Sequence, residues 1–377
     1  MRTGALAGRP VTIIGAGIGG LTAALALARR GAQVTVLERA GAFREVGAGI
    51  QVSPNAGRVL DALDVGAAFA AISAPSHGVE LRDGSGGALV ARLDYTRHRP
   101  DARFRAVHRA RLLDVLEAAA RKAGATIRLG EHVTDLPDAP LLIGADGLHS
   151  RVRTALNGPE RPFFTRQVAW RALIPLEDGG APLSQLFMGP GRHLVSYPLA
   201  GRLRNIVAVE EREAWAAEDW SQPDDPANLH AAFAGFGGPV PGWLEQVETC
   251  GIWGLFRHEV AGRWHDGTRA ILGDAAHPTL PFLAQGACMA IEDAWVLAAC
   301  LDAEPEQETA LARYQALRRP RAVRVVDAAT ANARNYHLDG LPKHAAHAAL
   351  RLASAAAPGV LFHRVAWVFD HDPTRLS

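Results

Sequence analysis

The stretch VTIIGAGIGG, residues 11–20, decides the fold of this chain. Its first four residues form a short β-branched run that predicts a buried parallel strand. Gly15, Gly17 and Gly20 then fill the glycine positions of a G-x-G-x-x-G loop, and the alanine- and leucine-rich residues 21–30 predict a helix. A strand, a glycine loop and a helix in this order predict the first βα unit of a dinucleotide-binding Rossmann domain.

Each part of this unit has a physical role in holding a dinucleotide. The first glycine permits a tight turn, the second lets a pyrophosphate approach the backbone, and the third lets the helix pack close to the strand. The helix N-terminus offers unpaired N–H groups and partial positive charge to the phosphates. A second strand over 34–37 delivers Glu38, whose carboxylate can bind a ribose 2′-hydroxyl and would repel a 2′-phosphate. The unit fits FAD or NAD, disfavours NADP, and does not choose between the first two.

Two later segments each place an aspartate and a glycine between a strand and a helix. Residues 140–153, PLLIGADGLHSRVR, place Asp146-Gly147 after a strand. Residues 270–294, AILGDAAHPTLPFLAQGACMAIEDA, place Gly273-Asp274 before a proline-rich loop and a long helix from about Gln285. Such aspartates lie at the carboxyl edge of a parallel sheet, where α/β proteins bind ligands. Taken alone, each pair is equally well explained as a turn with an N-cap.

Together the three motifs resemble those of the class A FAD-dependent aromatic monooxygenases, the family of salicylate hydroxylase and 3-hydroxybenzoate 6-hydroxylase, over the chain to about residue 330. The resemblance implies an α/β fold with a Rossmann-type FAD-binding domain, an inserted antiparallel β-sheet substrate domain like that of p-hydroxybenzoate hydroxylase, and a helical C-terminal tail. It implies FAD as cofactor, NADH or NADPH as a transient reductant without its own Rossmann domain, and O₂. The implied reaction is hydroxylation of a small aromatic (phenolic) acid through a flavin C4a-hydroperoxide.

The resemblance also assigns residues to the cofactor. Glu38 and Arg39 would hold the adenosine end of FAD, and the backbone of Val133 would contact the adenine. Asp274 would bind the ribityl chain and the pyrophosphate, assisted by N–H groups near Gly286 and Ala287. Arg109 would reach the cofactor, and the loops at Ala48 and at Pro278–Pro281 would flank the isoalloxazine ring. Gly273 and Asp146 would also contact the cofactor, and the contact at Asp146-Gly147 would extend to the nicotinamide donor.

The chain departs from the family pattern at three places. Residues 131–140, EHVTDLPDAP, are shorter than the strand pair of relatives, so we expect a thinner cover over the sheet near the adenine. Arg257-His258 stands where relatives usually have Asp-Arg, which puts the role of that acid in doubt. Phe282 is apolar where some relatives have a polar residue, so the substrate carboxylate has no evident partner; Arg171 is one candidate, and an arginine on the surface of a strand explains that residue equally well.

Residues 165–211 change to short runs of β-formers between glycine and proline turns, which predicts an antiparallel sheet over the flavin ring. His193 and Tyr197 lie four residues apart, so in a strand they face the same way about 13 Å apart and could line one wall of a cavity. The resemblance implies that this pair binds and deprotonates the substrate phenol, and a neutral histidine suits that task. A strand-edge histidine beside a half-buried tyrosine would show the same spacing. We expect His277 to order the flavin loop rather than to contact substrate.

The predicted domains interleave along the chain. The FAD-binding domain is expected at 1–75, 101–160 and 266–330, the substrate domain at 76–100 and 161–265, and a helical tail at 331–377. The tail is expected to cover the FAD-binding domain or to form a homodimer surface.

Composition argues against several other classes of protein. A net charge of +1 gives no electrostatic reason to expect nucleic acid or an anionic membrane as a partner. Cys250, Cys288 and Cys300 lack CxxC spacing, which predicts reduced, buried thiols and no metal site. The apolar residues 11–28 are too short and too glycine-broken for a membrane span, so we expect a cytoplasmic protein. The basic run Arg318–Arg324 is interpreted as one face of a helix.

Two alternatives stay open at this point. One is related FAD chemistry on another scaffold: urate, a quinone precursor, an antibiotic or an alkene. The other, from a different class, is a flavin redox sensor or an inactive accessory subunit. The Pro278–Pro281 loop and the His193 and Tyr197 pair argue against a sensor, which needs neither.

Overall fold

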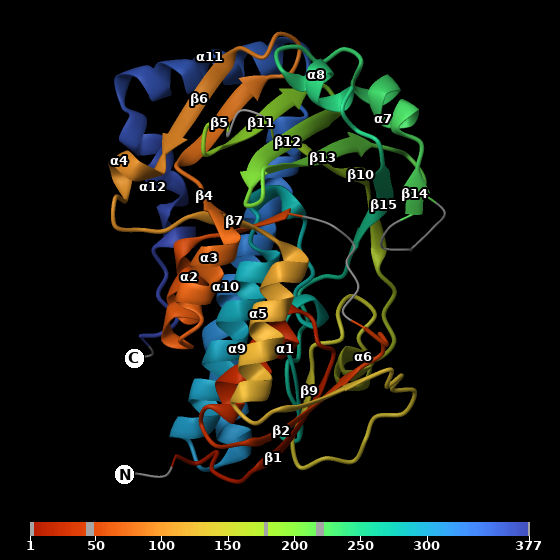
Figure 1. Ribbon diagram of the computed structural model, residues 1–377, viewed down its shortest axis with the longest axis vertical. Coiled ribbons are helices and arrows are strands. Elements are labelled where there is room, and N and C mark those ends of the chain that lie inside the picture. Colours follow the sequence, from red (N-terminus) through yellow and green to blue (C-terminus); the bar gives the residue numbers. More distant parts are fainter. Residues whose placement is uncertain (1–3, 43–48, 177–179, 216–221, 376–377) are drawn as a thin grey trace.

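Two sheets stacked along the long axis of the molecule organise the chain (Figure 1). The computed structural model describes residues 4–42, 49–176, 180–215 and 222–375. A parallel sheet lies at the end that holds the N-terminus, and a larger, mostly antiparallel sheet lies at the other end.

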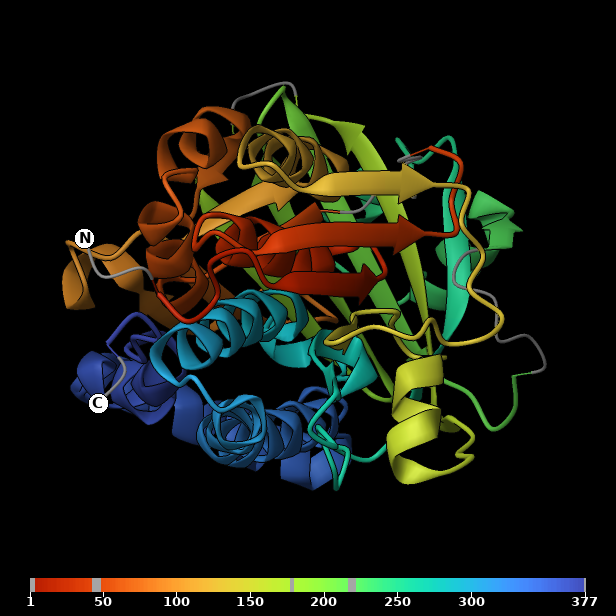
Figure 2. The same ribbon diagram turned by 90° about the horizontal axis from the view of Figure 1, so that it is seen from below.

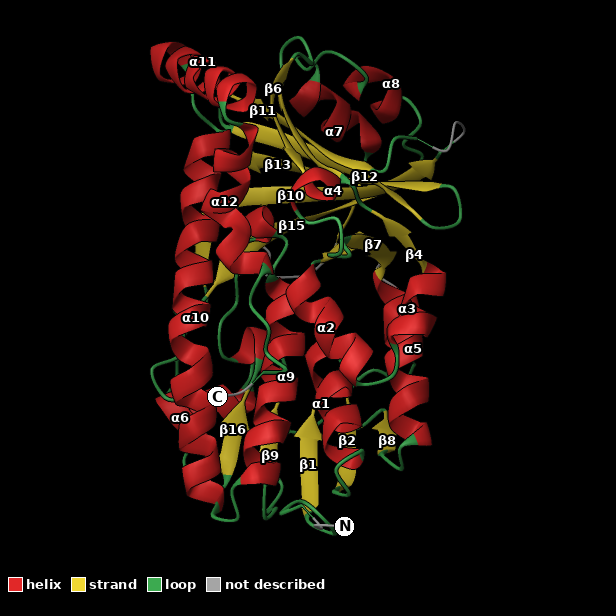
Figure 3. Ribbon diagram, turned by 90° about the vertical axis from the view of Figure 1, so that its left-hand side faces the viewer, coloured by secondary structure: helices red, strands yellow, loops and turns green. Residues whose placement is uncertain are grey.

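The parallel sheet has five strands in the order β16-β9-β1-β2-β8. Their bounds are Arg269–Ile271, Leu142–Gly144, Pro10–Ile14, Gln33–Glu38 and Thr126–Leu129. The strands at 11–14 and 34–37 were predicted from their β-branched residues, and each is one or two residues longer in the structure. Their carboxyl ends point toward the larger sheet (Figure 3). The three predicted motifs therefore open into the space between the sheets.

Helices cover the parallel sheet because their apolar residues complete its core. They are α1 (Ile18–Ala28), α5 (Arg109–Lys122), α9 (Gly286–Ala303) and α10 (Gln307–Tyr336). Every residue of α1 is buried, since it packs against both α5 and α9. Seen from below, α9 lies beside the sheet and α10 lies outside it (Figure 2). Residues 131–140 contain no helix or strand, and three of their apolar side chains, Val133, Leu136 and Ala139, pack against the core as a thin cover.

The larger sheet has the order β14-β15-β10-β13-β12-β11-β5-β6. Its strands are Gln222–Asp224, Cys250–Arg257, Phe163–Pro175, Leu203–Glu211, Arg192–Leu199, Leu183–Gly189, Gly78–Asp83 and Leu89–Asp94. All pairings are antiparallel except that between β11 and β5. Side chains alternate across the sheet. Trp170, Phe187 and Leu194 pack under α7 (Pro226–Phe233) and α8 (Val240–Leu244). The residues that alternate with such side chains along each strand face the parallel sheet.

Smaller elements join the two halves. A three-stranded sheet in the order β3-β7-β4 (Gly49–Val52, Arg105–His108, Ser73–Pro75) lies between them (Figure 1). The remaining helical segments are α2 (Pro54–Ala62), α3 (Gly66–Ile72), α4 (Tyr95–His98), α6 (Arg151–Asn157), η1 (Gly273–Ala275) and η2 (Pro281–Leu283). The tail is helical as predicted, with α11 (Gly340–Ala356) and α12 (Pro358–Phe369). The domain break predicted at residue 330 falls inside α10, and the domain bounds stay a prediction.

The predicted fold class is confirmed by this architecture. The three cysteines are free and buried, as expected. Among the described residues no single helix is long and apolar enough to cross a membrane; α11 and α12, bent by 101°, meet that test only as a pair.

Candidate active site

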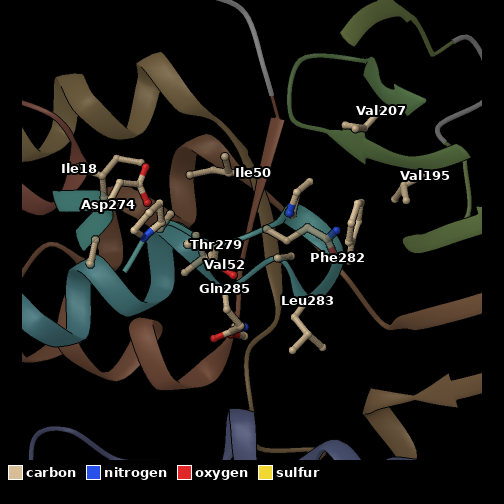
Figure 4. Close-up of a pocket in the computed structure, with 18 of the residues that line it drawn as sticks. Ile18, Ile50, Val52, Val195, Val207, Asp274, Thr279, Phe282, Leu283 and Gln285 are labelled. Carbon is tan, nitrogen blue, oxygen red and sulfur yellow. The ribbon is translucent and has the colours of Figure 1, made fainter. Parts of the chain in front are cut away.

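A cavity of about 1220 Å³ runs between the two sheets. Asp274 and Ile18 mark its end at the parallel sheet, and Phe282 lies toward Val195 and Val207 of the antiparallel sheet (Figure 4). Typical pockets for one small molecule measure roughly 300–1000 Å³. The cavity therefore has room for a dinucleotide and a second small molecule.

The glycine loop shapes one end of the cavity. A Cβ on Gly20 would meet the carbonyl oxygen of Gly15, so α1 can approach β1 only with glycine there. Gly15 has a φ of 100°, which favours glycine. Gly17 lines the cavity, and no described atom lies within 4 Å of where its Cβ would be. This open space, beside the uncapped N-terminus of α1, fits a pyrophosphate.

The carboxylate of Glu38 closes the turn between β1 and α1. It accepts hydrogen bonds from the backbone N–H groups of Ala16, at 2.7 Å, and Ala40, at 2.9 Å. Glu38, Arg39 and Val133 all line the cavity, so the three residues assigned to the adenosine end lie together.

Asp274 and Arg109 lie opposite each other farther along the cavity. Asp274 follows β16, and its exposed side chain faces the deep cavity rather than the outer surface (Figure 4). Desolvation there raises the pKa of Asp274, while the charges of His277 and Arg109 partly offset this. Gly286 and Ala287 form the N-terminus of α9, which has no side-chain cap and opens into the same space. Two open helix N-termini and a cation thus converge on one region, as a pyrophosphate requires.

Asp146 serves the fold locally. Its carboxylate accepts hydrogen bonds from the Ser150 hydroxyl, at 2.5 Å, and from the Arg151 backbone N–H, at 2.8 Å. It lines the cavity while it fixes the start of α6. A contact between Asp146 and a nicotinamide donor stays a prediction. The Nε2–H of His258 donates to the backbone carbonyl oxygen of Leu148 at 3.0 Å.

A buried ionic network that the sequence analysis missed supports the Gly273-Asp274 turn. The Asp293 carboxylate accepts from the Gly273 N–H, at 3.0 Å, and pairs with His277, at 2.5 Å, and with Arg318, at 2.7 Å. Arg318 also pairs with Glu292 at 2.6 Å. Burial alone would raise the pKa of Asp293, but the charges of His277 and Arg318 lower it to about 2. Asp293 therefore holds His277 at the start of the proline-rich loop, and the expected role of His277 in ordering this loop around the flavin stays a prediction.

The first residue of β3, Gly49, is held against the antiparallel sheet. The Gly49 N–H donates to the Asn205 Oδ1 at 2.8 Å. A Cβ on Gly49 would come within 2.9 Å of the Tyr197 ring, so Tyr197 packs against the start of β3. Burial raises the pKa of Tyr197, with a small opposing effect from Arg171. The neighbouring Ala48, assigned to the flavin ring, lies outside the described residues.

The wall of the cavity at the antiparallel sheet carries His193, Tyr197 and Arg171. His193 is 1 % exposed, and its ring lies edge-on to Phe282, with centroids 5.0 Å apart. Burial, with the nearby His337, lowers the pKa of His193 well below its ordinary value, so the imidazole is neutral. Arg171 lies over the Trp253 ring at 4.1 Å, and burial lowers its pKa to about 10. The wall thus presents one neutral base and one cation.

The comparisons with known proteins agree with this geometry. The model of a family described as an FAD binding domain matches residues 9–139 and 137–329. The 3-amino-4-hydroxybenzoate 2-monooxygenase of Streptomyces platensis is 35 % identical over 358 residues, covering 88 % of this chain and 90 % of the relative. The 3-hydroxybenzoate 6-hydroxylase of Polaromonas naphthalenivorans is 32 % identical over 364 residues, with 89 % and 90 % covered.

The chain is a member of the FAD-binding monooxygenase family.

Solved structures place the same fold around FAD. Klebsiella pneumoniae HpxO, complexed with FAD and uric acid, has a TM-score of 0.79 at 27 % identity, covering 91 % of this chain and 92 % of that one. A salicylate hydroxylase substrate complex matches with a TM-score of 0.81 at 23 % identity, covering 98 % and 97 %, and supports the fold alone. The open glycine cradle and the two helix N-termini fit FAD, which is the cofactor of this monooxygenase.

Most of the predicted site residues lie around the cavity of the monooxygenase. Gly20 does not line it, which suits its role in helix packing. The individual roles of these residues stay predictions. Asp293, Glu292 and Arg318 were not singled out, although EDA stood in the third motif and Arg318 began the basic run interpreted as a helix face. That run does lie in α10, but Arg318 is fully buried.

Proposed function

We propose that this monooxygenase hydroxylates a small phenolic acid, with NADH or NADPH as reductant and O₂ as oxidant. Bound FAD supplies the electron transfer and the oxygen activation. The named activities of the relatives, on hydroxybenzoates and an aminohydroxybenzoate, support this class of substrate. The observation that carries the proposal is His193, a neutral, buried base on the wall that faces the FAD site.

His193 is proposed to accept the proton of the substrate phenol. A phenolate donates electron density into its ring, which prepares the ortho and para carbons for attack by an electrophilic oxygen. General-base catalysis of this kind is typically worth about 10² to 10⁴ in rate. The apolar neighbours of His193, Phe282 and Val195, exclude water and hold the ring in the cavity.

Arg171 is proposed to bind the carboxylate of the substrate. It pairs with Val207 of β13, which in turn pairs with Val195 of β12, two residues from His193. Strand spacings then put the two Cα atoms roughly 12 Å apart on the same face. The ring of a hydroxybenzoate fits between the two side chains, with its hydroxyl at His193 and its carboxylate at Arg171.

A second candidate is an aromatic substrate with an apolar extension. Beyond His193 the cavity continues along an aliphatic surface under α11 and α12, formed by Leu81, Leu186, Met188, Leu350 and Val365. An aurachin C monooxygenase/isomerase of Stigmatella aurantiaca is 33 % identical over 335 residues. These five side chains are apolar and favour a hydrocarbon substituent, and Arg364 and His347 line the same cavity.

Oxygen uptake tests the proposal. The purified yellow protein is given NADH or NADPH, with and without a panel of hydroxybenzoates, aminohydroxybenzoates and hydroxynicotinates, and catalase is added afterwards to report peroxide. Strong stimulation by one acid with little peroxide supports the proposal and names the substrate. Stimulation by a phenol with a long alkyl substituent, and by none of the acids, supports the second candidate. No stimulation by any phenol overturns both.

A further inference from the structure

His193 is the inner end of a chain of three side chains that reaches the protein surface. Its Nδ1 lies 2.7 Å from the Nε2 of His337, and the Nδ1 of His337 lies 2.7 Å from the Oε1 of Glu211. The side chain of His337 is 3 % exposed, whereas that of Glu211 is 52 % exposed. The chain therefore connects the buried wall of the cavity to solvent without a gap.

The hydrogen bonds fix the tautomers of both rings. A carboxylate only accepts, so the Nδ1 of His337 carries a proton; because burial lowers the pKa of His337, its ring is neutral and its Nε2 is an acceptor. That acceptor requires a proton on the Nδ1 of His193. The Nε2 of neutral His193 is then a bare lone pair, on the only ring nitrogen not used in the His193–His337–Glu211 chain. His193 is thereby prepared to accept a proton from a ligand in the cavity.

We propose that His337 and Glu211 conduct the substrate proton between His193 and solvent. This inference rests on the proposed function. The phenol O–H bond breaks and the proton binds Nε2 of His193; the Nδ1 proton of His193 passes to Nε2 of His337; the Nδ1 proton of His337 passes to Glu211, which releases it to water. No electron moves in these steps. When the product oxygen is protonated, the same transfers run in reverse and restore both tautomers.

The surroundings of His193 explain why a relay is needed. The ring packs against Phe282 and against Tyr336, whose centroid is 5.3 Å away, and His193 is only 1 % exposed. Because burial lowers its pKa, His193 holds a proton poorly and must pass it on. The charged groups at the outer end include Arg192 from β12, Glu210 and Glu211 from β13, and Arg212, which follows β13 and pairs with Glu210 at 2.9 Å. His337 directly follows α10, whose last residue is Tyr336. Arg192 pairs with Glu210 at 3.4 Å and leaves Glu211 to His337.

The residues of this chain also stabilise the fold, and the test must separate that structural role from proton transfer. The His337 carbonyl accepts from the Gly191 N–H, and the Gly191 carbonyl accepts from the Glu211 N–H, so the same residues hold the end of α10 against the sheet. Glu211→Gln keeps an oxygen that accepts from His337 but cannot take up a proton. His230→Gln is the matched control, since His230 contacts the Leu244 carbonyl on the opposite face of the sheet.

The first readout needs no substrate. In the FAD-loaded protein, long-range ¹⁵N–¹H spectra of the histidine rings, assigned with His193→Asn and His337→Asn, report the tautomers. We expect His193 protonated at Nδ1 and bare at Nε2, and His337 protonated at Nδ1. A His193 protonated at Nε2 would overturn the relay, whatever the protein hydroxylates.

The second readout follows the proton itself. A phenolic acid that stimulates the wild type, or 3-amino-4-hydroxybenzoate if it binds without turnover, is mixed with enzyme and a pH-indicator dye in a stopped-flow instrument. We expect Glu211→Gln to slow phenolate formation and proton release by up to about 10²-fold, with FAD reduction unchanged and His230→Gln like the wild type. Equal proton-release rates in wild type and Glu211→Gln would overturn the relay. Failure of every phenol to bind the wild type counts against the proposed function, and the tautomer spectra still decide the relay.

Discussion

At the cofactor end of the cavity the functional groups come from three continuous stretches of sequence, whereas the substrate end takes single residues from distant strands and helices. Gly15, Gly17 and Glu38 lie within one βα unit and its next strand. Arg171, His193 and His337 come from β10, β12 and the end of α10. Backbone N–H groups can bind a phosphate whatever the side chains are, whereas side chains recognise a ligand through their own chemistry. The cofactor end therefore depends on backbone geometry, and the proposed substrate end depends on the identity of its side chains.

The glycine loop should give the largest combined effect, because one substitution there removes both stability and bound FAD, and it separates packing from binding. Gly20→Ala brings a Cβ into the Gly15 carbonyl oxygen, a backbone atom that cannot rotate away. Overpacking typically costs roughly 1–3 kcal/mol in the free energy of unfolding, and we expect a loss at the upper end of this range or above it. We also expect the variant to lose its bound FAD. Gly17→Ala meets no described protein atom, so it should fold normally and lose only FAD affinity. Thermal unfolding and flavin absorbance measure the two effects. Equal unfolding temperatures for both variants would contradict this division.

The buried ionic network should give the next largest effect. Arg318→Met leaves Glu292 and Asp293 buried without their shared cation, which should cost about 3–5 kcal/mol in the free energy of unfolding. Arg121→Met, which removes the surface pair with Glu117, is the control and should cost about 0.5 kcal/mol or less. Urea unfolding compares them. A loss below 1 kcal/mol at Arg318 would show that the network is not needed for the fold.

Arg171→Met tests the substrate end. We expect the KM of a carboxylated substrate to rise by roughly 10- to 100-fold, the worth of a hydrogen bond to a charged group, with a smaller change for the matching methyl ester. Steady-state oxygen uptake gives both values. A similar rise for acid and ester would mean that Arg171 acts through packing on Trp253.

Lowering the pH should gradually reduce the stability of the protein at its cofactor end. The pKa values of Glu292 and Asp293 are about 2 in the folded protein, against roughly 4 in an unfolded chain. Depressed pKa values contribute stability that is fully present above about pH 4 and is lost as the pH falls toward 2. The unfolding temperature of the wild type should fall across this window, and that of Glu292→Gln should fall less. Parallel curves for the two proteins would argue against the contribution of Glu292.

The sequence predicted the cofactor end more fully than the substrate end for a physical reason. Glycines, a strand and a ribose-binding acid act through local backbone geometry, so their spacing alone shows their purpose. Arg318 looked like a surface residue because its partners Glu292 and Asp293 lie on another helix, 25 or more residues away. His337 and Glu211 are 126 residues apart and meet only because α10 ends beside Gly191, before β12, and beside the last residue of β13. His193 was singled out, but its tautomer follows from contacts that no spacing reveals.

The central claim is that His193 serves hydroxylation and not flavin reduction. Rapid mixing of FAD-loaded wild type and His193→Gln with NADH, a phenolic acid and O₂ measures both steps in one turnover. The account predicts flavin reduction at the wild-type rate and hydroxylated product lower by about 10² or more, with peroxide in its place. Equal yields of hydroxylated product from the two proteins would contradict it.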